Sequence, residues 1–343
     1  MQPVFQKETV SVIIPAYNNP EYTRKTLKSI VEQQYRPIEV IISDDNSPNS
    51  LEMLPKEFEK FQNDRFKIRY YRQPSNLGMM DNFTFTVRKA TGKYLVPMAH
   101  DNGFIDKSFI SEAVKIMEAN PDCNLSIGNA VYENTNLEML SLPDNIKAKD
   151  CWEILEGDIF IRLWRSGGMG WTQAIVLDNQ VAHSLGAFDE PFLVNRALAK
   201  KLDLAVDNMF AFVFILSSIG SVALTGKVVC EIGTPENAYS RSDKWRKTRG
   251  KVKFIIFYNI YKANLTGKSA RAVKEMAMKQ AVEQALKRNI FDLKIMRHYN
   301  FRIEIIHLMS LFLLREARRF LKKLKKRAKH RVKDVWQQSR FNS

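Results

Sequence analysis

Short apolar runs alternate with amphipathic stretches through the first hundred residues. Continuous apolar runs predict four strands, at residues 10–14, 38–42, 66–71 and 93–98. Apolar residues at helical spacing predict a helix in each interval, at residues 22–34, 51–61 and 76–87, the last entered through a loop. Strands that alternate with helices and lack a polar face indicate a mainly parallel sheet covered on both faces. The sequence therefore predicts an α/β fold that binds ligands at the carboxyl ends of its strands.

The pattern becomes mainly helical towards the C-terminus. A helix at residues 109–117 and a strand at 125–132 continue the alternation, and an apolar helix is predicted at 206–218. From residue 251 onward, nearly all of the chain has helical spacing. We therefore expect the α/β fold to carry a helical C-terminal extension.

The charge of the chain is divided unevenly between its two parts. The 343 residues include 53 Lys and Arg against 37 Asp and Glu, a formal net charge of +16. Residues 1–240 carry 24 basic and 30 acidic side chains, whereas residues 241–343 carry 29 basic and 7 acidic ones. We therefore predict a mildly acidic domain over 1–240 and a basic helical extension over 241–343. Such asymmetry indicates contact with nucleic acid or with an anionic membrane surface.

The strongest basic run lies within residues 302–335. Between Arg315 and Lys333 there are 11 Lys or Arg and one acid, Glu316, interleaved with leucines and a phenylalanine at near-helical spacing. This pattern is typical of an amphipathic helix on a membrane surface. A solvated helix face or a disordered basic tail is the alternative. An aromatic platform or a known motif for nucleic acid is missing, so we expect an anionic membrane partner and no nucleic acid.

Three further features indicate the compartment. Three cysteines are too few and too scattered for a disulfide framework or a zinc cluster. The first ten residues include Glu8 and lack the apolar core of a signal peptide. The apolar run at 305–314 is half the ~20 residues that a membrane-spanning helix needs. We therefore expect a cytoplasmic protein that lies peripherally on the inner face of the cell membrane.

Polar side chains follow two of the predicted strands. Asp44 and Asp45 come directly after a buried strand, where carboxylates could accept hydrogen bonds from a nucleotide, although a turn and helix cap explains them as well. His100, Asp101 and Asn102 follow another strand. Hard oxygen ligands there suit Mg²⁺ or Mn²⁺ completed by substrate phosphates, and an Asx turn is the alternative.

Two later segments add candidates for the reaction itself. Asp207 begins the predicted apolar helix, as a helix cap would, or as a carboxylate base. Gly168 and Trp171 lie in a glycine-rich segment, where backbone could approach a ligand and an indole could stack on a sugar. A plain loop with a buried Trp is the alternative.

Six segments in order resemble glycosyltransferase family 2, the inverting GT-A transferases that use nucleotide-diphosphate sugars. The segments are residues 10–18 (VSVIIPAYN), 39–47 (EVIISDDNS), 76–78 (NLG), 90–95 (ATGKYL), 185–190 (LGAFDE) and Asp207. The likeness is strong to about residue 110, fair to about residue 233, and absent over the tail. It implies a GT-A fold, a Rossmann-like and mainly parallel sheet with helices on both faces.

The resemblance also implies roles for individual residues. Pro15, Tyr17, one or both of Asp44 and Asp45, and Asn76 would line the nucleotide pocket. Asp101 matches the metal-binding carboxylate of the D-x-D element, with His100 as a further candidate ligand. Asp207 matches the catalytic base. Gly168 and Trp171 are assigned to the acceptor or sugar from their residue types, and not through the resemblance.

The sequence departs from the family pattern at the metal element. Asn102 follows Asp101 where many relatives carry a second Asp, and His100 stands where another acid can occur. Fewer carboxylates weaken metal binding, and an imidazole ligand would favour Mn²⁺ over Mg²⁺. A divalent cation, Mn²⁺ or Mg²⁺, remains the expected cofactor.

The function predicted from the sequence is inverting transfer of a sugar from a nucleotide-diphosphate donor to a hydroxyl of a glycan or lipid-linked acceptor, in cell-surface polysaccharide synthesis. A sugar-1-phosphate nucleotidyltransferase is disfavoured, because Pro15 to Asn18 stand where its Gly-rich phosphate loop should be. A degenerate transferase that serves as a nucleotide- or membrane-binding scaffold is the alternative outside catalysis.

Overall fold

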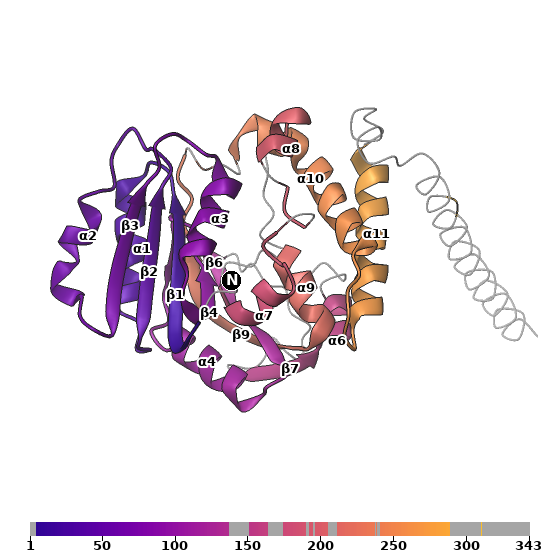
Figure 1. Cartoon of the computed structure of the whole chain (residues 1–343), viewed down its shortest axis with the longest axis horizontal. Helices are drawn as coiled ribbons and strands as arrows, with labels where there is room; N and C mark the ends of the chain where they lie inside the picture. Colours follow the sequence, from indigo (N-terminus) through magenta and orange to yellow (C-terminus); the bar gives the residue numbers. More distant parts are fainter. Residues whose placement is uncertain are drawn as a thin grey trace, which may run out of the picture. The chain divides into compact units, whose positions relative to one another are not determined.

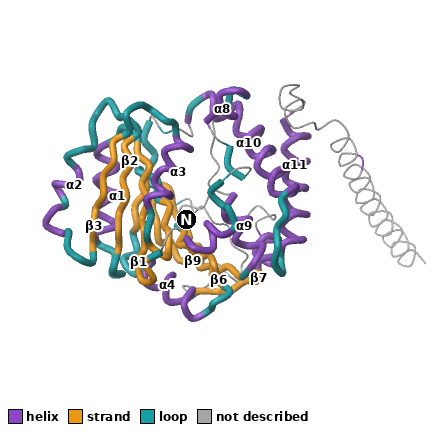
Figure 2. Tube along the Cα trace, viewed as in Figure 1, coloured by secondary structure: helices purple, strands orange, loops and turns teal. Residues whose placement is uncertain are grey.

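A computed structural model describes residues 5–136, 151–163, 174–189, 192–194, 196–204, 211–236, 238, 241–288 and 310. By contacts between residues, the chain divides into two units, residues 1–281 and 282–343. The first unit contains the sheet and most of the helices (Figures 1 and 2). Of the second unit, the description covers the end of one helix and Ser310.

The first unit is built on a nine-stranded sheet. Its path runs through β3 (Phe66–Arg72), β2 (Ile38–Asp44), β1 (Gln6–Ala16), β4 (Gly92–Pro97), β8 (Ile175–Asp178), β6 (Cys123–Tyr132), β9 (Ser221–Ile232) and β5 (Asn102–Phe104), with β7 (Trp152–Glu156) also paired to β9. The strands β3, β2, β1 and β4 are mutually parallel, and β6 is parallel to β9. β5, β7 and β8 pair antiparallel with their neighbours. The predicted α/β fold with a mainly parallel sheet is confirmed.

Helices connect these strands along the chain. The described helices are α1 (Pro20–Val31), α2 (Leu54–Glu57), the 3-10 helix η1 (Glu59–Phe61), α3 (Met79–Lys89), α4 (Phe109–Ala119), α6 (Gly157–Leu163), α7 (Asn179–Ser184), α8 (Arg196–Lys201), α9 (Ala211–Ile219), α10 (Asp243–Lys262) and α11 (Ala270–Arg288). The single helix predicted at 51–61 is wrong, because the segment forms α2 and η1 instead. A helix that began at residue 51 would need a hydrogen bond from the N–H of residue 55 to the Leu51 carbonyl, and Pro55 has no N–H to donate.

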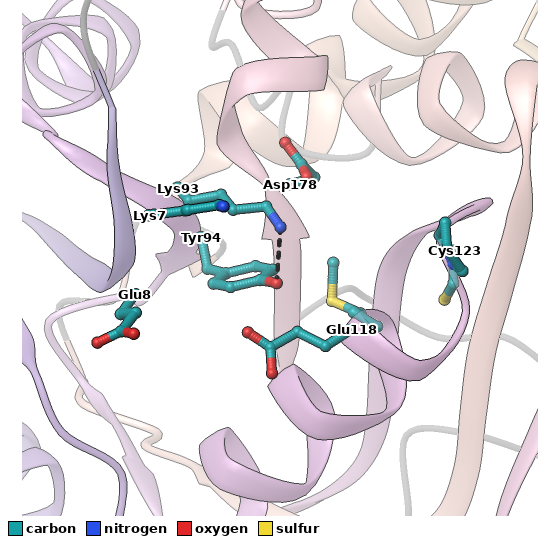
Figure 3. A pocket seen from close by; sticks show the side chains of 9 residues that line it. Lys7, Glu8, Lys93, Tyr94, Glu118, Cys123 and Asp178 are labelled. Atoms are coloured by element: carbon teal, nitrogen blue, oxygen red, sulfur yellow. Dashed lines mark hydrogen bonds between the residues drawn. The ribbon is translucent and has the colours of Figure 1, made fainter.

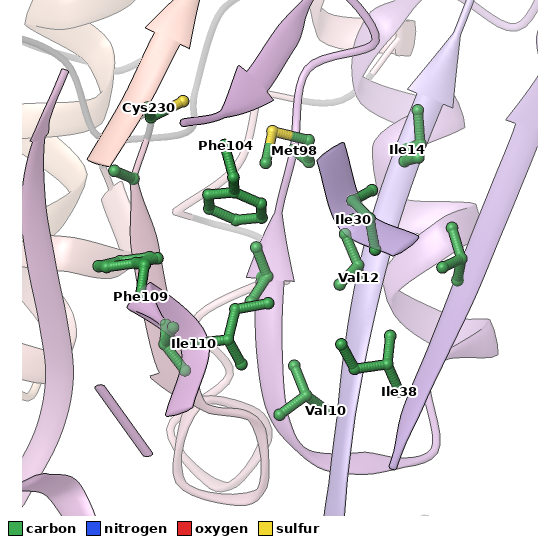
Figure 4. Packing of buried hydrophobic residues seen from close by; sticks show 14 of the residues in the cluster. Val10, Val12, Ile14, Ile30, Ile38, Met98, Phe104, Phe109, Ile110 and Cys230 are labelled. Atoms are coloured by element: carbon green, nitrogen blue, oxygen red, sulfur yellow. The ribbon is translucent and has the colours of Figure 1, made fainter. Parts of the chain in front are cut away.

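Alternate residues of β1 pack on opposite faces of the sheet. Val10, Val12 and Ile14 belong to a buried cluster with Ile30 of α1 and Phe109 of α4 (Figure 4). Ile13 between them is also fully buried, and α3 covers β1 and β2 on that other face. Both faces of the strand are therefore buried, which is why the segment reads as a continuous apolar run.

The helix α10 belongs to the first unit and packs on α9. The Phe257 ring meets that of Phe214 in α9 at 5.2 Å between centroids, and Trp245 is buried. The division by contacts at residues 281 and 282 thus falls inside the predicted extension 241–343. Within the described ranges, no helix combines the length and the apolar character needed to cross a bilayer.

Candidate active site

Three loops that follow parallel strands meet at one edge of the sheet. In the strand register Ala16 of β1 lies beside Asp44 of β2, and Ile13 lies beside Pro97 of β4. The loops after these strands are joined directly. The Asn18 N–H donates to Ser47 Oγ at 2.7 Å, and Asn19 Nδ2 lies 3.4 Å from His100 Nε2. The carboxyl edge therefore brings the predicted nucleotide and metal residues together.

Asparagines with a left-handed backbone conformation occur in two of these loops. Asn18, Asn19 and Asn46 have φ angles of 59°, 57° and 58°. Asn is one of the few residues with a side chain that adopts this region at moderate cost. Asn19 is the N-cap of α1, yet its side chain makes no capping bond. Its amide instead reaches His100.

Asp44 is fully buried at the end of β2 and is held by the protein itself. Its Oδ1 accepts from the Ser47 N–H at 2.8 Å, and its Oδ2 accepts from the Tyr70 hydroxyl at 2.8 Å and Arg72 Nη1 at 2.9 Å. Burial alone would raise the pKa of Asp44, but hydrogen bonds from Ser47 and Tyr70 outweigh it and the pKa is lowered. The carboxylate is therefore charged and fixes the loop around it.

Asp45 ties a further predicted segment to the same edge. It is buried, and its two oxygens accept from the N–H groups of Leu77 at 2.6 Å and Gly78 at 2.9 Å. Gly78 has a φ of 86°, a conformation that side chains rarely adopt. Asn76, just before this contact, is exposed. Asn76 therefore stands one residue before the backbone that Asp45 binds.

Pro15 and Tyr17 complete the described part of this edge. Pro15 is half-buried at the end of β1, and a hydrogen bond links its backbone to His100. Tyr17 follows with 45% of its surface exposed, although it is a large apolar side chain. An exposed ring at a strand end offers a flat face to a ligand.

His100 and Asp101 lie half-buried in the turn after β4. Burial lowers the pKa of His100, and the charge of Asp101 opposes that shift. Burial likewise raises the pKa of Asp101, and His100 opposes it. A bound cation would stabilise the carboxylate that burial disfavours.

The donor set fits a cation that the protein holds only in part. No group of three or more His, Cys, Asp or Glu able to hold a metal occurs among the described residues. One carboxylate and one imidazole, from Asp101 and His100, suit Mn²⁺ or Mg²⁺ when substrate phosphates supply further ligands.

The structure adds residues that the sequence analysis did not select. Glu133 follows β6, and its Oε2 accepts from the Tyr22 hydroxyl at 3.0 Å while its Oε1 lies 3.3 Å from Lys25 Nζ. Its negative charge raises the pKa of Asp101 further. Arg72 is the last residue of β3, and its guanidinium group forms an ion pair with Asp44. Both were detectable in principle, because each is a charged residue at the carboxyl end of a strand.

Three predicted site residues lie outside the described residues: Asp207, Gly168 and Trp171. The helix expected to begin near Asp207 is described from Ala211 onward, as α9.

A cavity of about 450 Å³ lies at the opposite, amino edge of the sheet (Figure 3). It is lined by Lys7 of β1, Lys93 and Tyr94 of β4, and Asp178 of β8, among others. Lys93 Nζ lies 3.0 Å from the Tyr94 hydroxyl. Among the predicted site residues that the structure describes, none lines this cavity, and its lining lies at the opposite ends of β1 and β4 from the carboxyl edge.

Comparison with solved structures identifies the class of this fold. It is similar to TarS of S. aureus, residues 1–349 in complex with UDP, with a TM-score of 0.57 and 13% identity over 86% of this chain and 76% of that one. It is also similar to the mannosyltransferase PcManGT of Pyrobaculum calidifontis in complex with GDP-Man and Mn²⁺, with a TM-score of 0.51 and 15% identity over 89% and 79% of the two chains. The fold is therefore of the GT-A type.

Sequence comparison finds similarity to glycosyltransferases. Residues 11–167 match the model described as Glycosyl transferase family 2. The chain is 28% identical over 123 residues to the glycosyltransferase GlyA of Streptococcus pneumoniae serotype 4, covering 36% of this chain and 17% of that protein. It is 27% identical over 152 residues to an uncharacterized glycosyltransferase of Haemophilus influenzae, covering 44% and 46%. The chain is therefore similar to glycosyltransferase family 2 over residues 11–167, less than half of its length, and its matches span less than half the length of these curated relatives.

Proposed function

We propose that this protein is an inverting glycosyltransferase. It moves a sugar from a nucleotide-diphosphate donor to a hydroxyl group of a glycan or lipid-linked acceptor, in the synthesis of a cell-surface polysaccharide. The observation that carries the proposal is the meeting of the loops after β1, β2 and β4 at one edge. Open α/β sheets bind ligands at this edge.

In this proposal the nucleotide lies against the loops after β1 and β2. The exposed ring of Tyr17 and the half-buried Pro15 contact the base or ribose. Asp45 and Asn76 line the same pocket, and Asp45 also holds the 76–78 segment in place. Asp44 belongs to the pocket as the buried anchor of its loop, because all of its surface is covered by the protein.

Asp101 and His100 would hold a divalent cation, Mn²⁺ or Mg²⁺. Such a cation, when bound, stabilises the negative charge that develops on the leaving diphosphate. Support comes from the donor set of the turn and from PcManGT, whose structure contains Mn²⁺ with GDP-Man.

Asp207 is the proposed catalytic base. A carboxylate on the side of the sugar opposite the diphosphate removes the proton of the attacking acceptor hydroxyl, so that one displacement inverts the anomeric carbon. Gly168 and Trp171 are proposed to contact the sugar or the acceptor.

We assign residues 1–240 to the transferase domain and residues 241–343 to a basic helical extension. Residues 302–335 would attach the protein to the inner face of the cell membrane, where lipid-linked acceptors lie. The charge of this segment supports the assignment, since 11 basic residues stand against one acid between Arg315 and Lys333.

Release of nucleoside diphosphate tests the proposal. The full chain is incubated with Mn²⁺ and a panel of UDP-, GDP- and TDP-sugars, with and without lipid-linked acceptors. We expect turnover with at least one donor. A folded protein that binds a nucleotide but turns over none of the donors would favour the scaffold alternative.

A further inference from the structure

A row of polar side chains on α1 holds the backbone of residues 100–110. Thr26, Ser29 and Gln33 follow the helical spacing i, i+3 and i+7, the last just past the end of the helix. Ser29 Oγ accepts from the Phe104 N–H at 3.0 Å, and Gln33 Nε2 donates to the Asp106 carbonyl at 2.7 Å. Successive polar side chains of this row therefore bind backbone groups at successive positions of the 100–110 segment.

Thr26 contacts the turn that carries the proposed metal ligands. We call His100, Asp101 and Asn102 the 100–102 turn. The Thr26 hydroxyl lies 2.5 Å from the Asn102 carbonyl oxygen and 3.0 Å from that of His100. It also lies 3.1 Å from the carbonyl of Tyr22 in its own helix, the usual partner of a helical Thr. The contact with the Asn102 carbonyl is shorter than the one with the Tyr22 carbonyl. The hydroxyl therefore links α1 to the 100–102 turn more than it bonds within its own helix.

The middle carbonyl of the turn is held from the other side. The Gly233 N–H donates to the Asp101 carbonyl at 2.9 Å. The turn is therefore held from two elements: the single Thr26 hydroxyl of α1 donates to the nearest carbonyl, that of Asn102, with the His100 carbonyl also within range, and the segment after β9 donates to Asp101. Thr26 itself has no exposed surface, so water cannot replace its hydroxyl.

We propose that Thr26 is a positioning residue: its hydroxyl fixes the 100–102 turn and thereby the placement of His100 and Asp101 for a divalent cation. This inference rests on the proposed function, because it assigns a purpose to the turn. Fixed backbone matters here because the protein supplies few ligands. Groups that orient metal ligands without touching the metal commonly change metal affinity by 10- to 100-fold when removed.

The test compares Thr26→Val with Thr23→Val. Thr23 lies one turn earlier on α1, is also fully buried, and its hydroxyl contacts the Asn19 carbonyl at 3.1 Å within the helix end. Both substitutions remove one buried hydroxyl and keep a β-branched side chain. Thr26→Ser keeps the hydroxyl and should therefore behave as the parent protein does. Thr26→Ala provides a second variant without the hydroxyl if the Val variant does not fold.

Two readouts on the full chain apply. Amide hydrogen exchange without ligands should show residues 99–104 exchanging about tenfold faster or more in Thr26→Val, and unchanged in Thr23→Val. Mn²⁺ binding, titrated by electron paramagnetic resonance with UDP or GDP present, should weaken at least about tenfold in Thr26→Val alone.

The outcomes separate the two claims. Equal exchange and equal Mn²⁺ affinity in the two Val variants would overturn the role of Thr26, as would faster exchange with unchanged Mn²⁺ affinity. A parent protein that binds no Mn²⁺ with either nucleotide would instead contradict the proposed metal site itself.

Discussion

Two adjacent aspartates at the end of β2 have different partners. Asp44 points its oxygens at its own loop and at Tyr70 and Arg72 of β3, whereas Asp45 binds the backbone of Leu77 and Gly78. Both carboxylates are therefore part of the frame of the site. Asp207, four residues before the start of α9 in the sequence, is the acid proposed as the catalytic base.

Replacing the proposed base should stop the reaction without affecting donor binding. Asp207→Asn keeps the size of the side chain but cannot accept the acceptor proton, so transfer should fall by at least about 100-fold. Initial rates and a donor titration measure the two effects. Asp203→Asn is the control, because Asp203 is an exposed carboxylate four residues earlier that pairs with Lys244 at 2.8 Å. Normal transfer by Asp207→Asn would remove this residue from the base role.

The charge of Asp44 should stabilise the fold in a pH-dependent way. Its pKa is lower in the folded protein than the value near 4 of an unfolded Asp. Its contribution to the free energy of unfolding is therefore complete above about pH 5 and is lost as the pH falls through the folded pKa. Asp44→Asn should cost about 2 kcal/mol at pH 7, because it leaves buried donors without an acceptor. The difference from the parent should shrink towards pH 3.5.

Urea unfolding at several pH values measures this effect. Asp122→Asn is the control, since its side chain is 78% exposed and lies 3.6 Å from Lys268. That variant should stay within about 0.5 kcal/mol of the parent. A constant cost of Asp44→Asn between pH 7 and pH 3.5 would show that its charge is not the cause.

At the scale of elements, strand length and continuity decided what the sequence could predict. β1, β2 and β4 were predicted because burial on both faces leaves mainly apolar runs, whereas the edge strand β3, with Lys67 and Arg69 in it, was predicted from its aromatic and β-branched residues. β5 has three residues and β8 has four, too few to display a period. β9 has twelve residues, but Gly226 and Lys227 interrupt its apolar pattern.

The same reasoning applies to the site. Polar residues at strand ends were predicted because carboxyl edges of parallel strands converge. The role of Thr26 was not predicted, because a Thr inside a helix has the same local sequence pattern whether its hydroxyl contacts its own helix or another segment. Its partner lies 76 residues further along the chain, and this pairing exists only in the folded protein.

The segment after β9 should tolerate no side chain beside the 100–102 turn. A Cβ at Gly233 would lie 2.0 Å from the Asp101 carbonyl oxygen and 2.9 Å from Tyr22 Cε1. Gly233→Ala must therefore displace the turn, and we expect transfer to fall by about tenfold or more. Gly103→Ala is the matched control, because its Cβ would lie 3.5 Å from Ser29 Oγ, an ordinary contact. Equal rates in the two variants would contradict a fixed turn.

At the scale of the whole chain, the net charge of +16 separates into a mildly acidic domain and a strongly basic extension. All proposed site residues lie in the acidic part. The basic part begins with α10, which packs on α9, and continues into residues beyond α11. Under the proposed membrane attachment, the charge of the chain concerns where the protein acts rather than the reaction.

Neutralising the basic run should release the protein from membranes. Each Lys near an anionic surface contributes about 1 kcal/mol, so replacing Lys322, Lys323, Lys325 and Lys326 with Gln should weaken liposome binding by at least about tenfold. Sedimentation with phosphatidylserine vesicles measures it. The control replaces four exposed lysines of the first domain, Lys28, Lys56, Lys60 and Lys67. Unchanged binding by the tail variant would refute the membrane assignment.

The central claim is that the nucleotide of a sugar donor binds at the carboxyl edge of β1, β2 and β4. Amide hydrogen exchange with and without UDP or GDP, in the presence of Mn²⁺, tests it most directly. We predict that the nucleotide slows exchange at residues 15–19, 44–47, 76–78 and 99–102. The exchange rates around Lys7 and Lys93 at the amino edge should not change. Protection confined to the amino edge, or no protection with either nucleotide, would contradict the account.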